Sequence, residues 1–160
     1  YSIELFEAKV PLRVRQYALN TDGGAGAGRQ RGGFGVVREF EIVADEAHTY
    51  CSYGRSIVPP WGLEGGGDGS TNYMEFDHDG ETHRVSRIAY QALARGDRVR
   101  VVTGGGGGFG DPHDRPPEAV NADVRDGYVT RDQARGAYGV VINDAGETDA
   151  EATANLRGGT

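Results

Sequence analysis

Residues 98–110 read RVRVVTGGGGGFG, so a strand-forming run passes directly into five consecutive glycines. The chain holds 27 glycines in 160 residues, well above the usual share of about 7%. They are bunched at 23–35, 62–69 and 104–110, between segments rich in Val, Ile, Phe and Tyr. In a disordered chain, glycine is spread through polar sequence. The bunching therefore predicts glycine-rich loops in a folded domain, where they serve either close main-chain packing or a ligand lying against the main chain.

Length and charge exclude several classes of protein. A chain of 160 residues has the length of one ordinary domain, so we expect a single domain over 1–160. The 17 basic and 24 acidic residues give a formal charge of −7, and the basic residues form no cluster, which argues against a nucleic-acid partner. No apolar run reaches the roughly 20 residues that span a bilayer, so we expect no membrane contact and a cytoplasmic location. Cys51 is the single cysteine, which excludes an intrachain disulfide.

Hydrophobic periodicity assigns the first two thirds of the chain mainly to strands. Residues 2–9 have helical spacing that Pro11 ends. Alternating residues predict strands at 12–19 and 98–103, a hairpin formed by 36–43 and 47–53, and a second hairpin over 72–85. In the second hairpin, Asp79-Gly80 is the typical pair of a two-residue type I′ turn.

The last third contains helix signals. Pro117 and Gly127 bracket a helix in the positions that favour each residue. Thr130 and Gln133 predict a capping box on a single helical turn, followed by a strand at 137–142, and Thr148 with Glu151 predicts the start of a helix at 149–157. The fold class is therefore α+β: a β-rich domain of mostly antiparallel hairpins with long glycine-rich loops and short C-terminal helices.

Histidine provides the one internal candidate for a metal site. The predicted turn pairs His78 with Glu81 and Phe76 with His83, which places two imidazoles and a carboxylate on one face of the hairpin. This set suits a divalent ion. The alternative is a polar, solvated face in an acidic stretch, and without fixed supporting groups we favour the absence of a metal site.

Nucleotide and nucleophile motifs are missing. Gly105, Gly107 and Gly110 fit G-x-G-x-x-G, but Pro112 and the prolines that follow prevent a helix from starting at the last glycine. No phosphate-binding G-x-x-x-x-G-K-[ST] and no G-x-S-x-G motif occurs. We expect no nucleotide site and no self-sufficient catalytic site in this chain.

Four blocks of sequence resemble the C-terminal part of the hydantoinase B/oxoprolinase family, whose relatives include acetone and acetophenone carboxylase subunits. In order, they are residues 22–39 (DGGAGAGRQRGGFGVVRE), 59–66 (PPWGLEGG), 104–112 (GGGGGFGDP) and 138–141 (YGVV). The resemblance covers nearly the whole chain. Because family members are considerably longer, and because this chain begins at Tyr1, we expect a C-terminal fragment of a hydantoinase B-type subunit.

The resemblance implies ATP-dependent hydrolysis of a cyclic amide or imide such as hydantoin or 5-oxoproline, together with a hydantoinase A-type subunit that binds ATP. It also implies a divalent metal held in the missing N-terminal part, so that this fragment alone binds neither cofactor and is inactive. A carboxylase of the acetone or acetophenone type and a non-catalytic structural module are the alternatives. The reading frame upstream of this segment would help to distinguish them.

Four residues near the glycine loops are candidates for substrate binding: Arg29, Arg31, Asp111 and His113. A guanidinium binds carboxylate or phosphate through two parallel hydrogen bonds. If loops 23–35 and 104–110 face one ligand, the strands that lead into them run parallel. Arg29 or Arg31 then turns toward Asp111 or His113. The favoured alternative is a structural clamp on loop carbonyls. Trp61 follows two prolines and is either packed in the core, which we favour, or presented to a neighbour.

Overall fold

A computed structural model describes residues 2–22 and 24–158. These residues form two compact units. The sheet unit comprises residues 2–20, 35–58 and 71–104, and the loop–helix unit comprises residues 21–34, 59–70 and 105–158. Among these residues no helix is both long enough and apolar enough to cross a membrane.

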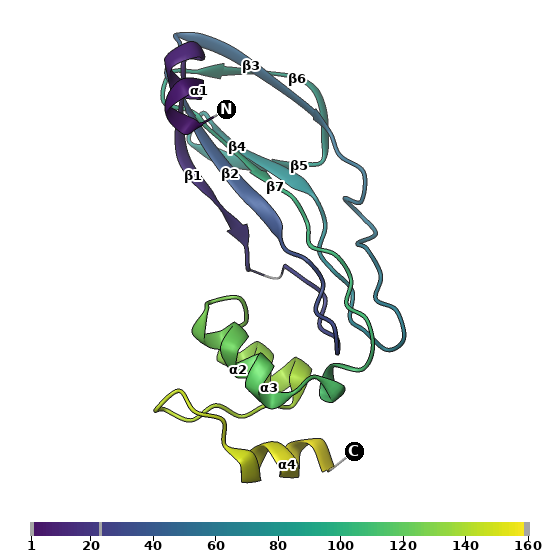
Figure 1. Cartoon of the computed structure of the whole chain (residues 1–160). Coiled ribbons are helices and arrows are strands. Elements are labelled where there is room, and N and C mark those ends of the chain that lie inside the picture. Colours follow the sequence, from purple (N-terminus) through teal and green to yellow (C-terminus); the bar gives the residue numbers. More distant parts are fainter. Residues whose placement is uncertain (1, 23, 159–160) are drawn as a thin grey trace. The chain divides into compact units, whose positions relative to one another are not determined.

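The sheet unit contains seven strands in two antiparallel sheets (Figure 1). The larger sheet has the order β1-β2-β7-β4-β5, and the smaller pairs β3 with β6. The strands are β1 (Leu12–Asn20), β2 (Gly35–Ile42), β3 (Glu46–Ser52), β4 (Tyr73–His78), β5 (Glu81–Val85), β6 (Arg87–Ala94) and β7 (Arg98–Val102). The short helix α1 (Ile3–Lys9) precedes them and packs Phe6 on Phe40 of β2, with ring centroids 5.9 Å apart.

The core of this unit lies between the two sheets. Cross-strand register places Val14, Phe40, Val99 and Phe76 in one row across the large sheet. Buried residues of both sheets form one cluster: Ile42, Cys51, Met74, Phe76, Leu93 and Val99. The alternation in the sequence thus produces a two-layer unit, because each sheet buries one apolar face.

Local signals predicted several elements correctly. The hairpin over 72–85 is confirmed, with Met74 opposite Val85 and His78 opposite Glu81. Asp79 and Gly80 have φ of 52° and 80°, the positive values that a type I′ turn needs at both positions. The predicted helix at 2–9 and strands at 12–19 and 98–103 are confirmed within a residue or two.

The hairpin predicted from 36–43 and 47–53 is wrong. β2 pairs with β1 and β7, whereas β3 pairs with β6, a strand that the sequence pattern had not revealed. After β2 the N–H groups of Val43 and Ala44 donate to the carbonyl oxygen of Pro11, at 3.1 and 3.3 Å. These bonds tie the chain to the start of β1, and β3 then joins the other sheet.

Three helices form the C-terminal part of the loop–helix unit. They are α2 (Pro117–Arg125), α3 (Arg131–Tyr138) and α4 (Ala150–Gly158), and a 3-10 turn, η1 (Pro112–Asp114), precedes them. A second buried cluster joins them: Val120, Val129, Ala134, Tyr138 and Val140. The α+β class is therefore confirmed.

Two predictions for this part need correction. The capping box of Thr130 and Gln133 is present, but α3 runs for eight residues, so the strand predicted at 137–142 is wrong. Ala137 and Tyr138 complete the helix, and Gly139 ends it in the left-handed conformation, with φ of 62°. The start of α4 is capped by Asp149, whose Oδ1 accepts the Ala152 N–H at 2.9 Å, instead of by Thr148, whose hydroxyl accepts from Asn121.

Candidate functional site

Three glycine-rich segments of the loop–helix unit lie side by side: residues 24–34, 59–70 and 105–110, here called the glycine bundle (Figure 1). Main-chain hydrogen bonds join all three pairs of segments. Gly26 N–H donates to Gly106 O at 2.9 Å, Gly67 N–H to Ala27 O at 2.7 Å, and Gly108 N–H to Gly67 O at 2.9 Å. Gly23, at the start of the predicted loop, lies outside the described residues.

Glycine is needed here because main chain packs directly on main chain. A Cβ on Gly108 would lie 2.5 Å from the carbonyl carbon of Ala27 and 2.8 Å from Gly26 O. A Cβ on Gly26 would lie 2.5 Å from Gly108 N. Other glycines of all three segments have similarly little room. As at the axis of the collagen triple helix, only glycine fits. Of the two roles that the sequence left open for the glycines, the contacts support packing.

The glycine run is not a phosphate cradle. Six of its seven N–H groups already have acceptors within the protein: those of Gly104, Gly105, Gly106, Gly108, Phe109 and Gly110. A phosphate loop needs such donors to face the ligand, and it needs a helix N-terminus beside them. Here the 3-10 turn η1 follows, at Pro112. The residues of this run therefore do not fit a nucleotide.

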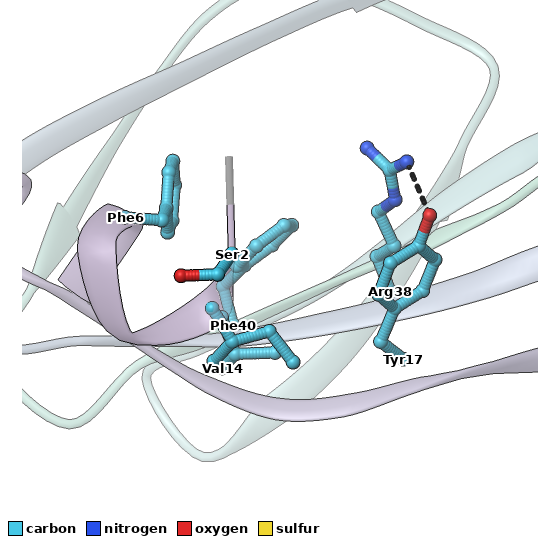
Figure 2. A pocket seen from close by; sticks show the side chains of 7 residues that line it. Ser2, Phe6, Val14, Tyr17, Arg38 and Phe40 are labelled. Atoms are coloured by element: carbon cyan, nitrogen blue, oxygen red, sulfur yellow. Dashed lines mark hydrogen bonds between the residues drawn. The ribbon is translucent and has the colours of Figure 1, made fainter.

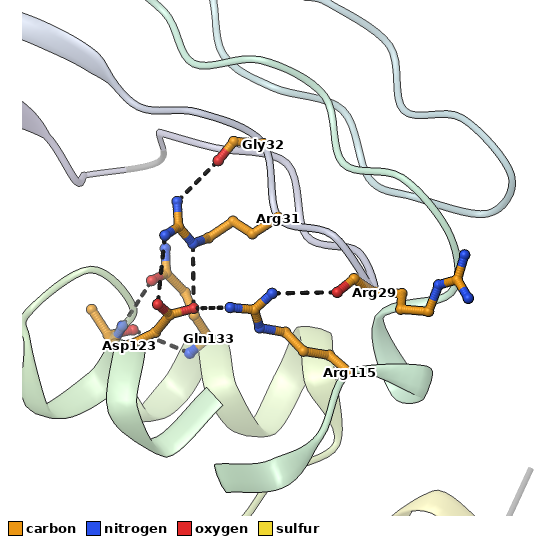
Figure 3. Close-up of polar contacts among 7 residues, drawn as sticks. Arg29, Arg31, Gly32, Arg115, Asp123 and Gln133 are labelled. Carbon is orange, nitrogen blue, oxygen red and sulfur yellow. Dashed lines mark hydrogen bonds and ion pairs between the residues drawn. The ribbon is translucent and has the colours of Figure 1, made fainter. Parts of the chain in front are cut away.

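A buried charge cluster fastens the bundle to α2 (Figure 3). The Asp123 carboxylate accepts from Arg31 Nε at 3.3 Å and from Arg115 at 2.8 Å. Arg31 also donates to Gly32 O at 3.0 Å, and Arg115 donates to Arg29 O at 3.3 Å. The side chains of Arg31, Arg115 and Asp123 are only 20%, 15% and 11% exposed, so these ion pairs lie largely outside bulk water.

Aromatic rings complete the surroundings of Arg31. Its guanidinium carbon lies 4.4 Å from the ring centroid of Phe34 and 5.5 Å from that of Tyr128, distances at which cation–π attraction operates. Nearby on α3, Tyr138 is buried. Burial raises the pKa of the Tyr138 hydroxyl, because desolvation penalises the phenolate.

The structure brings the two long loops together as the shared-ligand hypothesis required. β1 and β7 both run antiparallel to β2, so they run parallel to each other. Within the loop–helix unit Gln30 pairs with Phe109. Arg29 donates its N–H to Gly110 O at 3.2 Å, and its guanidinium carbon lies 5.9 Å from the Phe109 ring centroid.

The ion pair of Arg31 differs from the predicted one, since its partner is Asp123 instead of Asp111 or His113. Asp111 caps η1 by accepting the His113 N–H at 2.8 Å, and the His113 ring lies beside Gly139. These contacts support the structural-clamp alternative for Arg31. Sequence reasoning missed Asp123, although it lies three residues after the buried Val120 on the same face of a helix, and a carboxylate there needs a partner.

The histidine pair has the predicted register but separate surroundings. His78 Nδ1 lies 3.2 Å from Asp97 Oδ2, whereas the His83 ring stacks on Phe76 with centroids 5.1 Å apart. Over residues 2–22 and 24–158, no group of three or more His, Cys, Asp and Glu side chains is arranged to hold a metal.

Two further features lie on the surface. Trp61 is 59% exposed, so the expectation that it packs in the core is wrong. Beside α1, a surface pocket of about 340 Å³ has Phe6, Val14 and Phe40 in its lining (Figure 2). At its other side the Arg38 guanidinium donates to the Tyr17 hydroxyl at 3.0 Å. No residue predicted as a site residue lines this pocket.

Comparison with known proteins identifies close relatives. The B-type component of a D-/L-hydantoinase of Pseudomonas sp. strain NS671, itself assigned only provisionally, is 36% identical over 159 residues, which cover 97% of this chain and 26% of that protein. The beta subunit of the caprolactamase of Pseudomonas jessenii is 39% identical over 160 residues, covering 94% of this chain and 27% of the relative. This chain therefore spans about a quarter of the length of the relatives.

Solved structures agree. The crystal structure of ATP-dependent caprolactamase from Pseudomonas jessenii matches with a TM-score of 0.85 and 37% identity, over 98% of this chain and 28% of that one. A nucleotide-free acetone carboxylase shares the fold, with a TM-score of 0.85 at 24% identity, over 99% of this chain and 26% of its own. The family model for hydantoinase B/oxoprolinase matches residues 1–112. The chain therefore belongs to the hydantoinase B/oxoprolinase family.

Proposed function

We propose that this chain forms the C-terminal part of a hydantoinase B-type subunit, in an ATP-dependent hydrolase of cyclic amides or imides. The main support is identity of 36–39% to a hydantoinase component and to the beta subunit of a caprolactamase over nearly the whole chain. Those relatives are named as subunits, and the matching caprolactamase structure is of an ATP-dependent enzyme. A hydantoinase A-type partner that holds ATP is part of the proposal.

The chemistry explains why a second subunit is needed. An amide carbonyl is a poor electrophile, and transfer of a phosphoryl group to its oxygen supplies a leaving group. The glycine-run donors described above are already bonded, so we place ATP outside this chain. We place the divalent metal outside it as well, since the described residues hold no suitable ligand group.

Within the complex, this chain's residues act mainly as a scaffold. The glycine bundle is fixed by main-chain bonds and by the two ion pairs of Asp123, so it presents Arg29 and Asp111 on a rigid framework. Arg29 and Asp111, together with His113, remain the candidates for contact with substrate, and Arg31 acts chiefly as a clamp. A cytoplasmic location fits both ATP use and the free, buried thiol of Cys51.

The test replaces the matching segment of the caprolactamase beta subunit with this chain. Together with the caprolactamase partner subunit, the chimera should hydrolyse ATP when caprolactam, hydantoin or 5-oxoproline is added. The isolated 160-residue chain should not. Substrate-stimulated ATP use by the isolated chain would contradict the proposal.

Controls separate the alternatives. A chimera that folds and assembles but is inactive with every cyclic amide would favour the non-catalytic module. ATP use that instead needs acetone or acetophenone with bicarbonate would favour a carboxylase. Native-like sedimentation of the chimeric complex shows that assembly has succeeded before activity is interpreted.

A further inference from the structure

A cavity of about 300 Å³ lies within the loop–helix unit, next to Arg31. Two of the bundle segments form one wall, and α3 with the residues before it forms the other. The lining includes Ala25, Ala27, Arg31, Tyr128, Val129 and Ala137. Its volume is at the lower end of the range of about 300–1,000 Å³ for small-molecule sites, so the ligand must be small.

The charge beside this cavity is unbalanced. One carboxylate, that of Asp123, lies between the guanidinium groups of Arg31 and Arg115, so the three groups together have a net charge of +1. All three side chains are at most 20% exposed. A positive charge held away from water is stabilised by a nearby anion.

Hydrogen-bond donors are also in excess. The Arg31 guanidinium has five N–H groups, and within the described part of the chain its three hydrogen bonds go to Asp123 and Gly32. In the same cluster, the buried Nε of Arg115 has no partner among the described residues. Buried donors without acceptors are uncommon in folded proteins, and a bound oxyanion provides acceptors.

The lining favours a carboxylate among small anions. Small apolar side chains, those of Ala25, Ala27, Ala137 and Val129, surround much of the space, and the Arg31 guanidinium supplies the charged edge. A short alkyl chain suits the apolar walls, and a carboxylate matches a guanidinium in shape and charge. Asp68 also lines the cavity, but its Oδ1 accepts the Gly62 N–H at 3.0 Å, so this carboxylate has a partner in the bundle.

We propose that this cavity binds a small aliphatic carboxylate, with its carboxylate group on Arg31 and its alkyl chain against the alanine-lined walls. Such binding belongs to this chain alone and goes beyond the proposed ATP-dependent reaction. An inactive complex would therefore leave this inference unchanged.

The experiment titrates the 160-residue chain with butyrate and follows the amide NMR signals of Ala25, Ala27 and Ala137. Butyramide, which has the same shape without the charge, is the matched ligand control, and inorganic phosphate tests the other common oxyanion. We expect saturable shifts with butyrate and none with butyramide. Equal shifts with both compounds, or shifts with phosphate alone, would overturn the proposal.

Three variants locate the site. Arg31→Gln removes the cation and should weaken butyrate binding about tenfold or more. Ala137→Leu fills the cavity without touching the ion pairs and should abolish binding, which keeps the test decisive if the Arg31 variant folds poorly. Arg29→Gln changes a guanidinium of the same loop that does not line the cavity, and it should bind like the unaltered chain. Unchanged binding by Ala137→Leu would refute this location.

Discussion

Substitution of Gly108 by alanine should strongly destabilise the loop–helix unit. Gly108 is buried at the centre of the glycine bundle, where its N–H donates to Gly67 O at 2.9 Å. The added methyl would meet the Ala27 carbonyl carbon at 2.5 Å and Gly26 O at 2.8 Å, and it would lie closer still to Ala27 O. All three atoms are main chain, so no side-chain rotation relieves the overlap.

The expected cost follows from this rigidity. Overpacking a well-packed interior typically costs about 1–3 kcal/mol. Because the neighbours here are hydrogen-bonded backbone, we expect the upper end, about 3 kcal/mol. With a urea dependence of about 2 kcal/mol per M, the unfolding midpoint should fall by about 1.5 M.

The matched control is Gly33→Ala. Gly33 belongs to the same bundle, but a Cβ there meets nothing within 4 Å, and its φ lies outside the left-handed region. Its replacement should change stability by less than about 1 kcal/mol, in the stabilising direction, because alanine restricts the unfolded chain. Urea unfolding followed by the fluorescence of Trp61, the single tryptophan, reports on this unit directly. Equal midpoints for the two variants would refute the packing argument.

Three further predictions concern other parts of the loop–helix unit. Asp123→Asn leaves the two arginines facing each other without a carboxylate and should cost about 3 kcal/mol in urea unfolding, whereas Asp126→Asn, in an exposed pair, should cost less than about 1 kcal/mol; similar losses would contradict the clamp. Because the pKa of Tyr138 is raised in the folded state, its contribution to stability is full below the unfolded value of about 10 and is lost as the pH rises further; the free energy of unfolding of Tyr138→Phe should fall less steeply above about pH 10, and parallel pH profiles would argue against this assignment. Exposed Trp61 should promote self-association, so Trp61→Ser should sediment more nearly as a monomer, and a wholly monomeric parent chain at high concentration would contradict this.

Much of the fold could be predicted from local sequence signals, whereas strand partners could not. Asp79-Gly80 determines its turn because two adjacent residues must both adopt positive φ. Thr130 and Gln133 likewise satisfy each other within one turn. By contrast, β3 pairs with β6 instead of β2, because the choice depends on which sheet buries Cys51 and Leu93.

The candidate site shows the same division. Glycine bunching and the neighbouring arginines are visible in the chain, and they correctly predicted that loops 23–35 and 104–110 meet. The partner of Arg31 was not predictable, because Asp123 lies 92 residues away and the alternatives Asp111 and His113 have the same polar character.

The sequence alone determined the family, the α+β class, the hairpin turn and the helix caps, because each depends on short motifs or on the torsion angles of a few adjacent residues. Only the tertiary structure decided why the glycines are there and what Arg31 binds. Both answers depend on atoms brought together from distant segments. The methyl group that each bundle glycine lacks would overlap a carbonyl of another segment, and a carboxylate of α2 fixes the guanidinium. Such contacts are selected by packing of the whole loop–helix unit, and local sequence does not encode them.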